Sequence, residues 1–301
     1  MKKIAVGIIL MLGFALLQPA QAQTNSSIVI IDTAIDTTLP ELQGKVIHEV
    51  CLLEELRCPN GKAFQEGLGS ATLPVPQVYN GGFSHGTRMA QIAIKNNPNL
   101  NIVFIRIFPA GKNGNVEYAA ANANSTVKQA IDWVIKNKTK FNIVAVSASV
   151  GHKVQPSAPN SCQLRSKFDV GLKQSLAQLK SIGVAFISST GNRADKGTID
   201  YPACLADAIA VSSVTEHNTV ASYANDSLDV DFYALGTYEL SSGKVSGTSA
   251  ATAAFAAYWA KNYKGTYQLT YDYLKSIGTI SLSSQLNLEM EKRPIWVDVL
   301  K

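Results

Sequence analysis

Short apolar runs alternate along this chain with segments in which apolar residues recur every three or four positions. The runs are continuous and rich in β-branched residues, which is typical of strands buried on both faces of a parallel sheet. They predict strands at residues 28–31, 102–108, 143–147, 184–188, 208–214 and 230–233. The segments with a helical period predict helices at residues 85–96, 118–137, 168–181 and 249–263.

Alternating strands and helices predict an α/β fold: one domain with a doubly wound, mostly parallel sheet and helices on both faces. Residues 52–84 and 151–166 are rich in Gly, Pro, Asn and Ser, so we expect surface loops there. Functional sites in such sheets lie at the carboxyl ends of the strands. Polar residues that follow the predicted strands are therefore the first candidates for chemistry.

The N-terminus has the pattern of a signal peptide. Lys2 and Lys3 precede an apolar stretch, and Ala20-Gln21-Ala22 forms a small-x-small cleavage site. We expect residues 1–22 to be removed, and the mature, secreted or periplasmic protein to begin at Gln23. An uncleaved anchor is the alternative, but about fourteen apolar residues are short for a membrane span.

Charge adds little to this picture. After residues 1–22, the chain carries 25 basic and 22 acidic residues, spread evenly. A balance so close to zero argues against nucleic acid or an anionic membrane surface as the partner. We therefore expect no nucleic acid partner, and no membrane association after the signal peptide is cleaved.

The four cysteines fit an oxidising compartment, where an even count usually forms disulfides. Three pairings exist, and we favour Cys51–Cys58 as a local loop with Cys162–Cys204 joining two later loops. A zinc site is the alternative. It is disfavoured because the chain has no Cys-x-x-Cys.

Four polar residues stand at predicted strand ends or helix starts: Asp32, His85, Asn192 and Ser249. A serine nucleophile needs an imidazole to take its proton, a carboxylate to orient that imidazole, and donors for the oxyanion. Each role has one candidate here. Taken alone, Gly-Thr-Ser at 247–249 is also a common way to begin a helix.

The remaining histidines and a nearby aspartate have simpler interpretations. His48, His152 and His217 lack partner motifs, so we expect surface or loop residues. Asp36 is expected to hold a turn or accept hydrogen bonds rather than catalyse.

The order Asp, His, Ser along the chain is that of the subtilisin type of triad. From residue 28 to about residue 263, the chain resembles the subtilisin-like serine proteases, or subtilases. The motifs that carry the resemblance are Ile30-Ile31-Asp32-Thr33-Ala34-Ile35-Asp36, His85-Gly86-Thr87, Ser149-Val150-Gly151, Thr190-Gly191-Asn192, Tyr201-Pro202-Ala203 and Gly247-Thr248-Ser249-Ala250.

The resemblance implies roles for the four candidates. Asp32 would orient His85, His85 would act as general base and then acid, and Ser249 would form an acyl-enzyme. The side-chain amide of Asn192 and the backbone N–H of Ser249 would stabilise the oxyanion.

The resemblance also implies how substrate would bind. Ser149, Val150 and Gly151 would form an extended wall that pairs with the substrate backbone, as an added β-strand does. Ser189, Thr190 and Gly191 would form the opposite wall of the pocket for the side chain before the cleaved bond. Since both walls are uncharged, we expect an apolar or medium-sized side chain there.

The chain departs from the family in its prosegment. Subtilases usually carry an inhibitory folding chaperone before the catalytic domain, whereas only nine residues separate the expected cleavage site from Asp32. We expect residues 23–301 to form the peptidase domain without a prosegment. Either the chain folds unaided, or a separate chaperone or inhibitor polypeptide replaces the prosegment.

Smaller departures concern single positions and calcium. Ala34, Arg88, Gln91 and Thr252 stand where the family usually has Gly, His, a small residue and Pro. The link at residues 95–101 is too short for the family's calcium loop. The isolated carboxylates Asp195, Asp200 and Asp226 do not have the spacing of a calcium loop, so we expect no cofactor, with a weaker calcium ion left open.

The sequence therefore predicts an exported serine endopeptidase that acts on peptides or proteins. Two alternatives stay open. One is a catalytically silent pseudo-protease that serves as a binding or scaffold module, and the other is a dedicated peptide-processing enzyme or ligase. An α/β-hydrolase is disfavoured by the triad order and by the absence of Gly-x-Ser-x-Gly around Ser249.

Overall fold

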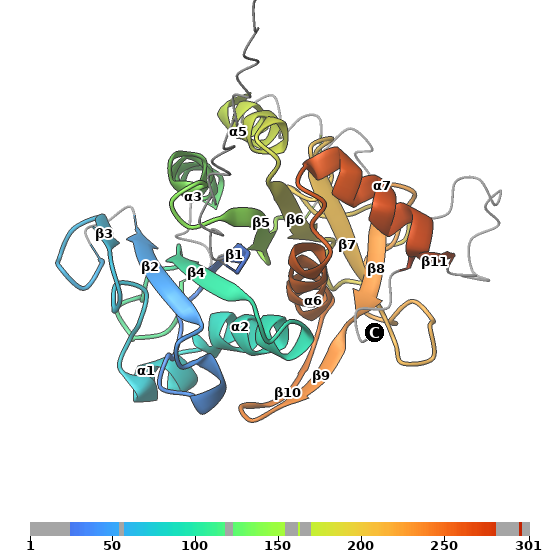
Figure 1. The fold of residues 1–301 in the computed structure, drawn as a ribbon. Coiled ribbons are helices and arrows are strands. Elements are labelled where there is room, and N and C mark those ends of the chain that lie inside the picture. Colours follow the sequence, from blue (N-terminus) through green and yellow to red (C-terminus); the bar gives the residue numbers. More distant parts are fainter. Residues whose placement is uncertain are drawn as a thin grey trace, which may run out of the picture.

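A ten-stranded sheet runs through the middle of the computed structural model (Figure 1). The structure describes residues 25–53, 57–117, 123–153, 162, 170–280 and 295–296. The strands of the sheet are β1 (Ser27–Asp32), β2 (Val46–Leu52), β3 (Phe64–Glu66), β4 (Asn101–Arg106), β5 (Ile143–Ala148), β6 (Ala185–Ser189), β7 (Ala208–Val214), β8 (Phe232–Leu235), β11 (Thr279–Ile280) and β12 (Ile295–Trp296).

The strand order is β11-β12-β8-β7-β6-β5-β1-β4-β2-β3. All neighbours pair in parallel except at the two edges, where β3 and β11 run antiparallel to β2 and β12. A separate hairpin joins β9 (Thr237–Leu240) and β10 (Gly243–Ser246). The central strands are buried along their whole length, which explains their continuous apolar sequence.

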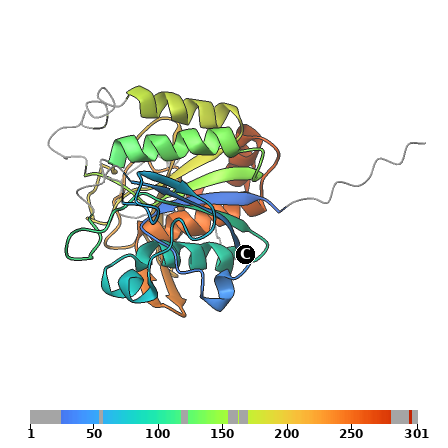
Figure 2. The same ribbon diagram turned by 90° about the vertical axis from the view of Figure 1, so that its left-hand side faces the viewer.

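Helices cover both faces of the sheet (Figure 2). On one face, α2 (Ser84–Asn96), α6 (Thr248–Lys261) and α7 (Tyr267–Ile277) share a core with Ile28 and Ile30 of β1. On the other face, α3 (Ala123–Asn137) and α5 (Val170–Ser181) share a core with Val29 and Ile31. The side chains of successive β1 residues thus pack into the cores on opposite faces of the sheet, as their alternation along a strand requires. The predicted fold class is confirmed.

The six predicted strands are all present, with boundaries shifted by one or two residues at several ends. The first five residues of the helix predicted at 118–137, and residues 168–169 of the one predicted at 168–181, lie outside the described residues. The loop predicted at 52–84 is wrong in part, since it contains β3 and the short helix α1 (Val75–Asn80). Most of the loop predicted at 151–166 lies outside the described residues.

Strand β2 escaped prediction because charged and polar residues interrupt its apolar run. Glu49 is only 1% exposed, and its Oε2 accepts the backbone N–H of Ala71 at 2.9 Å. Burial raises the pKa of Glu49. Hydrogen bonds from the backbone of residues 69–72 lower the pKa and so offset part of this rise. The backbone thus provides partners that let a carboxyl group lie inside a strand.

Two disulfides are present, in the pairing that we favoured. Cys51 is bonded to Cys58, and Cys162 to Cys204, with Cα–Cα distances of 5.8 Å and 6.2 Å. All four sulfur atoms are therefore engaged as disulfides rather than as zinc ligands. The second bridge ties the segment before α5 to the loop that follows Asp200.

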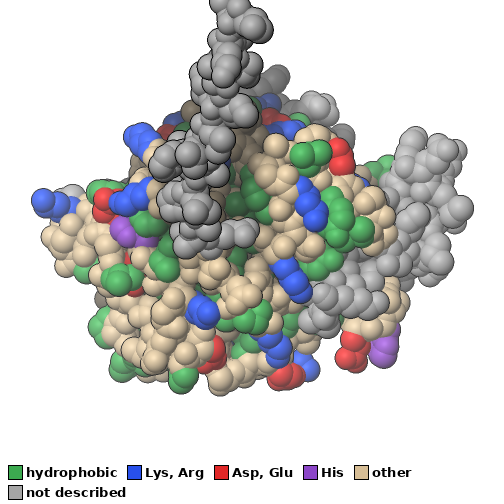
Figure 3. Space-filling view, viewed as in Figure 1, with side chains coloured by type: hydrophobic (Ala, Val, Ile, Leu, Met, Phe, Trp, Pro, Cys, Tyr) green, Lys and Arg blue, Asp and Glu red, His purple; other side chains and the backbone are tan. Residues whose placement is uncertain are grey.

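The surface carries no long basic stripe on the face shown in Figure 3, where basic and acidic side chains of the described residues are scattered among neutral ones. Among the helices in the described part of the chain, none has both the length and the apolar character needed to cross a membrane.

Candidate active site

Asp32 and His85 form a hydrogen-bonded pair at the carboxyl end of β1. His85 Nδ1 lies 2.8 Å from Asp32 Oδ1 and 2.9 Å from Oδ2. Because a carboxylate only accepts, Nδ1 carries the proton and donates it to Asp32. The Asp32 side chain is 1% exposed and that of His85 is 34% exposed. The carboxylate is thus sealed in the protein, while the imidazole reaches the surface.

Thr33 holds the strand and the helix that supply this pair. Its hydroxyl donates to the backbone carbonyl of Phe83 at 2.7 Å and accepts the N–H of Gly86 at 3.1 Å. An added Cβ at Gly86 would lie 2.5 Å from the Ala34 carbonyl oxygen and 3.1 Å from Asp32 Cβ. Glycine at position 86 therefore lets the first turn of α2 lie directly against the end of β1.

The environment of His85 shifts its basicity. Burial lowers the pKa of the imidazole, but the negative charge of Asp32 and its hydrogen bond together raise the pKa above the ordinary value. The positive charge of Arg88 opposes this in part. The net effect is an imidazole with more affinity for a proton than a free histidine, as a general base requires.

Ser249 lies in the first turn of α6, which packs on α2 within one hydrophobic core. Its backbone carbonyl accepts a hydrogen bond from the Ser149 hydroxyl at 3.4 Å. No described residue makes a hydrogen bond to the Ser249 hydroxyl itself. In unliganded proteases such a bond is often long and shortens only when substrate binds. The structure thus places Ser249 at a helix start beside the predicted wall, without an established link to His85.

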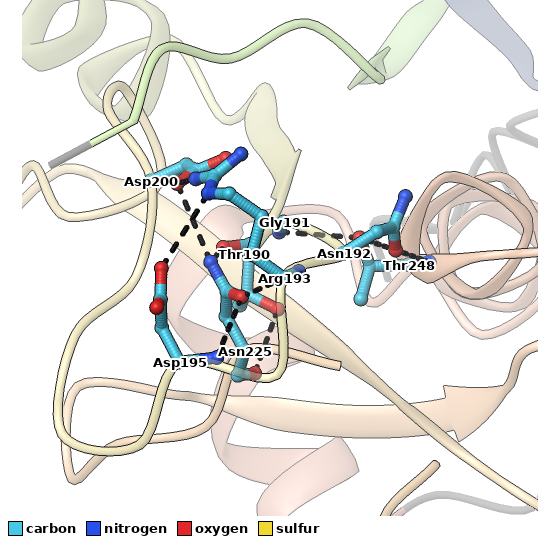
Figure 4. Close-up of polar contacts among 8 residues, drawn as sticks. All are labelled: Thr190, Gly191, Asn192, Arg193, Asp195, Asp200, Asn225 and Thr248. Carbon is cyan, nitrogen blue, oxygen red and sulfur yellow. Dashed lines mark hydrogen bonds and ion pairs between the residues drawn. The ribbon is translucent and has the colours of Figure 1, made fainter. Parts of the chain in front are cut away.

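Asn192 is clamped against the start of the same helix (Figure 4). Its Oδ1 accepts the backbone N–H of Thr248 at 2.8 Å and the Thr248 hydroxyl at 3.0 Å. Since a backbone N–H only donates, the amide oxygen must face Thr248 and the NH₂ group must face away. The Thr248 hydroxyl also accepts the Gly191 N–H at 3.2 Å, which completes the clamp.

Gly247 makes this contact geometrically feasible. Its φ of +156° lies in a region that side chains rarely adopt, and an added Cβ would lie 3.3 Å from Asn192 Nδ2. A side chain at position 247 would therefore crowd the amide group. The tripeptide 247–249 thus serves both to begin the helix and to receive Asn192.

The two predicted walls lie on either side of a segment that sequence reasoning did not identify. Asp200 N donates to the Thr190 carbonyl at 2.9 Å, which joins the segment to one wall. Tyr201 and His152 exchange backbone hydrogen bonds of 2.8 Å and 3.1 Å, which join it to the other. An added Cβ at either Gly151 or Gly191 would contact the Asp200 side chain. The description of this region as uncharged is therefore incomplete.

A cluster of charged and polar groups holds Asp200 and its neighbours (Figure 4). Arg193 forms an ion pair with Asp200, and its Nε lies 3.4 Å from Asp195 Oδ2. Asn225 Nδ2 donates to Asp200 Oδ1 at 3.3 Å and to the Thr190 carbonyl at 2.9 Å. Asn225 Oδ1 accepts the backbone N–H of Arg193 at 2.9 Å.

The carboxylates considered for calcium thus have protein partners. Asp195 and Asp200 share Arg193, while Asp226 accepts a hydrogen bond from Tyr233 and has Lys196 Nζ at 4.0 Å. In the part of the chain that the structure describes, no three His, Cys, Asp or Glu side chains gather as a metal site would require.

The unusual residues on α2 connect it to the turn of the β9–β10 hairpin. Gln91 Nε2 donates to Glu41 Oε1 at 2.7 Å and to the Ser241 hydroxyl at 2.8 Å. Arg88 donates to the Ser242 carbonyl at 3.5 Å. These side chains therefore have polar partners on the side of α2 that meets the hairpin.

The other two departures are also accommodated. Ala34 is fully buried, with its carbonyl oxygen facing Gly86. Thr252 is fully buried in α6, and its hydroxyl donates to the Thr248 carbonyl one turn earlier at 2.8 Å. A threonine can make this bond without leaving the helix, so proline is not needed at this position.

The remaining polar residues lie apart from this cluster. Asp36 accepts the N–H and hydroxyl of Thr38 and the hydroxyl of Tyr79, in agreement with its predicted turn role. His48 differs from the prediction in lying within β2, where it stacks on Trp133. His217 is exposed.

Sequence reasoning missed the supporting residues around the candidates. Thr33 and Thr248 lay within the quoted motifs, and their positions next to Asp32 and Ser249 could have flagged them. Asn225 had no such signal, because its side chain contacts residues 25 to 35 positions earlier in the chain.

Comparisons with known proteins find similarity to serine proteases. The model of the subtilase family matches residues 23–277. The chain is 24% identical over 298 residues to the "Major intracellular serine protease" of Bacillus subtilis, covering 92% of this chain and 78% of that protein. It is 25% identical over 247 residues to "Subtilisin E" of the same species, covering 76% of this chain but only 53% of that protein.

A solved structure of a cold-adapted subtilisin-like serine proteinase superposes with a TM-score of 0.64 at 19% identity. The superposition covers 92% of this chain and 89% of that one. At such low identity the likeness concerns the fold.

Proposed function

The chain belongs to the subtilase family, and from that premise we propose that it is an exported serine endopeptidase acting through an acyl-enzyme on Ser249. The family supports serine peptidase activity on peptide or protein substrates. The roles of single residues, the endopeptidase mode and export are the parts that this proposal adds.

In the proposed mechanism, Asp32 fixes the tautomer of His85. The Nδ1–H donates to the carboxylate, so the unprotonated Nε2 is left to accept a proton from Ser249. The hydroxyl oxygen then attacks the peptide carbonyl carbon, and the imidazolium donates its proton to the departing amine. Water repeats the sequence on the acyl-enzyme, which releases the acid product and restores Ser249.

The oxyanion that forms during attack is held by two donors. The Nδ2 group of Asn192 faces away from Thr248 and is the first donor, and the backbone N–H of Ser249 is the second. The N-terminus of α6 adds the positive end of its dipole. Both donors are held in place before substrate arrives, which is what makes such electrostatic stabilisation effective.

Substrate binds in an extended form. The wall at residues 149–151 pairs with the substrate backbone as an added strand, and residues 189–191 form the opposite side of the pocket. Gly151 is exposed, so its backbone is accessible for this pairing.

The observation that carries the proposal is the hydrogen-bonded pair of Asp32 and His85, with the carboxylate sealed from solvent. A pseudo-protease has no need to keep this buried charge and its imidazole partner together. Occupation of all four catalytic positions therefore favours turnover over a silent scaffold.

The test is hydrolysis of a labelled, unfolded protein by the purified mature chain. Ser249→Ala should lower kcat by on the order of 10⁴-fold or more. Ser246→Ala is the matched control, because Ser246 is exposed on the hairpin and its hydroxyl pairs with Thr237. Full activity in Ser249→Ala, or none in the wild type, would overturn the proposal. Transfer of the acyl group to added amines in preference to water would identify a ligase.

Export rests on the basic and apolar N-terminal pattern and on the two disulfides. One relative is named as an intracellular protease, so location needs its own test. N-terminal sequencing of protein from the periplasm or medium should begin at Gln23. Cytoplasmic protein with residues 1–22 retained would contradict export.

Folding control is part of the same proposal. Either the chain folds unaided, or a separate chaperone or inhibitor polypeptide assists it. Unassisted refolding of the purified mature chain to full activity would remove the need for such a partner.

A further inference from the structure

Residues 200 and 201 form a floor between the two proposed walls of the substrate pocket. Asp200 N is hydrogen-bonded to the wall at Thr190, and Tyr201 is paired with His152 directly after the other wall. The side chain of this segment that lies nearest to both Gly151 and Gly191 is that of Asp200.

The Asp200 carboxylate lies close to both walls because each has a glycine there. An added Cβ at Gly191 would lie 2.5 Å from Asp200 Oδ2, and one at Gly151 would lie 3.5 Å from the same oxygen. Gly191 has a φ of +105°, which also favours glycine. The Asp200 side chain thus lies against both glycines, and next to it at Gly191 is Asn225 Nδ2, which lies even closer to the same added Cβ.

The two oxygens of Asp200 have different surroundings. Oδ1 accepts from Arg193 and from Asn225 Nδ2. Oδ2 makes no hydrogen bond to any residue that the structure describes, although Asp200 is only 5% exposed. Oδ2 is not completely buried, so solvent can reach it, and a cation brought by a ligand could bind it there.

The local charge balance favours a cationic ligand. Arg193 is shared between Asp195 and Asp200, so this group of three carries a net negative charge. Asn225 adds hydrogen bonds but no charge. The Arg193 side chain is about one-third exposed, so it can turn toward solvent and stay near Asp195 when another cation reaches Asp200.

We propose that Asp200 makes this pocket select a lysine or arginine side chain before the cleaved bond. The substrate's cation binds Oδ2 between Gly151 and Gly191, and Arg193 moves aside. This rests on the proposed protease function and specifies its substrate class. It replaces the expectation of an apolar side chain that the uncharged walls suggested.

An acidic substrate side chain fits less well. To bind an acidic side chain, Arg193 would have to face the pocket. Arg193 is instead paired with two carboxylates of this protein, Asp195 and Asp200. An apolar side chain would exclude water from Oδ2 without supplying a hydrogen-bond donor, which disfavours it.

The first experiment compares kcat/KM for tetrapeptide nitroanilides that differ only in the residue before the cleaved bond: Arg, Lys, Leu, Ala or Glu. The wild type should favour Arg and Lys over Leu and Ala by about tenfold or more, and Asp200→Asn should lower the Arg/Ala ratio by a similar factor. Asp272→Asn is the matched control, because it removes one carboxylate from the exposed side of α7, where Asp272 accepts from Gln268, and lies near neither glycine. It should keep the preference.

Arg193→Gln provides a second variant that keeps Asp200 in place. Without its competitor, the Arg/Ala ratio should rise several-fold. If Asp200→Asn fails to fold, the Arg/Ala ratio of Arg193→Gln still tests the proposal. A wild type that prefers Glu, Leu or Ala, or an Arg/Ala ratio unchanged in both variants, would overturn the proposal.

Binding to the Ser249→Ala protein separates this proposal from the protease function. Calorimetry with uncleaved peptides should show tighter binding, by about tenfold, for arginine than for norleucine at the same position, and loss of the difference in Asp200→Asn. Equal affinities would overturn the proposal even if the enzyme is active. If the wild type hydrolyses no substrate but the arginine peptide still binds more tightly, the binding proposal would stand and the proposed protease function would be contradicted.

Discussion

The two halves of the candidate site are built in different ways. The half around Asp32 and His85 combines the carboxylate–imidazole pair with backbone and hydroxyl contacts between two elements, β1 and the first turn of α2. The half around Asn192 and Asp200 uses charged and amide groups that join segments from residue 190 to residue 248. The first half would serve proton transfer, and the second would serve both the oxyanion, through Asn192, and substrate selection, through Asp200.

This difference indicates where change would be tolerated. In the first half, Gly86 leaves no room for even one methyl group against Asp32 and the Ala34 carbonyl. In the second half, a partly exposed ion pair between Arg193 and Asp200 can rearrange. We expect damage to the first half, and to Asn192, to affect all substrates alike, and damage around Asp200 to affect them unequally.

The largest effect should come from Asp32→Asn. An amide in place of the carboxylate accepts poorly from Nδ1–H and favours the wrong tautomer of His85, so kcat should fall by on the order of 10⁴-fold. The ratio of rates for Arg and Ala substrates should stay the same. Steady-state kinetics with both substrates tests this, with Asp36→Asn as the control. A loss restricted to one substrate would contradict the division into halves.

Asn192→Ala should have the next largest effect. Loss of one oxyanion donor should lower kcat by about 10²–10³-fold. KM should change little, because the donor acts on the oxyanion and not on the bound substrate. A rise in KM with unchanged kcat would assign Asn192 to substrate binding instead.

The two disulfides should differ in what they stabilise. From the loop lengths, removing Cys162–Cys204 (separation 42) should cost about 4 kcal/mol and removing Cys51–Cys58 (separation 7) about 2 kcal/mol. Denaturant unfolding of the two Cys→Ser double variants measures this. Cys204 N donates to the Asp200 carbonyl at 3.1 Å, so only the first variant should also weaken substrate selectivity. Equal costs would contradict the loop-length argument.

The smallest effect concerns pH. Activity needs neutral His85, and Asp32 raises the pKa of its imidazole above 6.5. The rate should therefore fall as pH drops through a midpoint above 6.5. Arg88→Gln should move the midpoint further up, because the positive charge of Arg88 opposes protonation of His85. A lower midpoint in Arg88→Gln would contradict the claim that Arg88 opposes protonation of His85.

Each half of the site can be predicted from the sequence only as far as its residues stand in local sequence patterns. Contacts between residues far apart in the chain leave no such pattern. Asp32, His85 and Ser249 stand at the ends of strongly patterned strands and helices, so the fold and the triad candidates could be predicted from local sequence. The Arg193–Asp200 pair and Asn225 could not, because nothing near Asn225 shows that it reaches Thr190 and Arg193. Strand β2 was missed for a similar reason, since the partners of Glu49 lie some 20 residues further along the chain.

The central claim is that His85 activates Ser249, and labelling by a fluorophosphonate tests it most directly. The wild type should be modified at Ser249 within minutes, Ser249→Ala should not react, and His85→Ala should react far more slowly although folded. Labelling of the wild type at another residue, or equal rates in wild type and His85→Ala, would contradict the account.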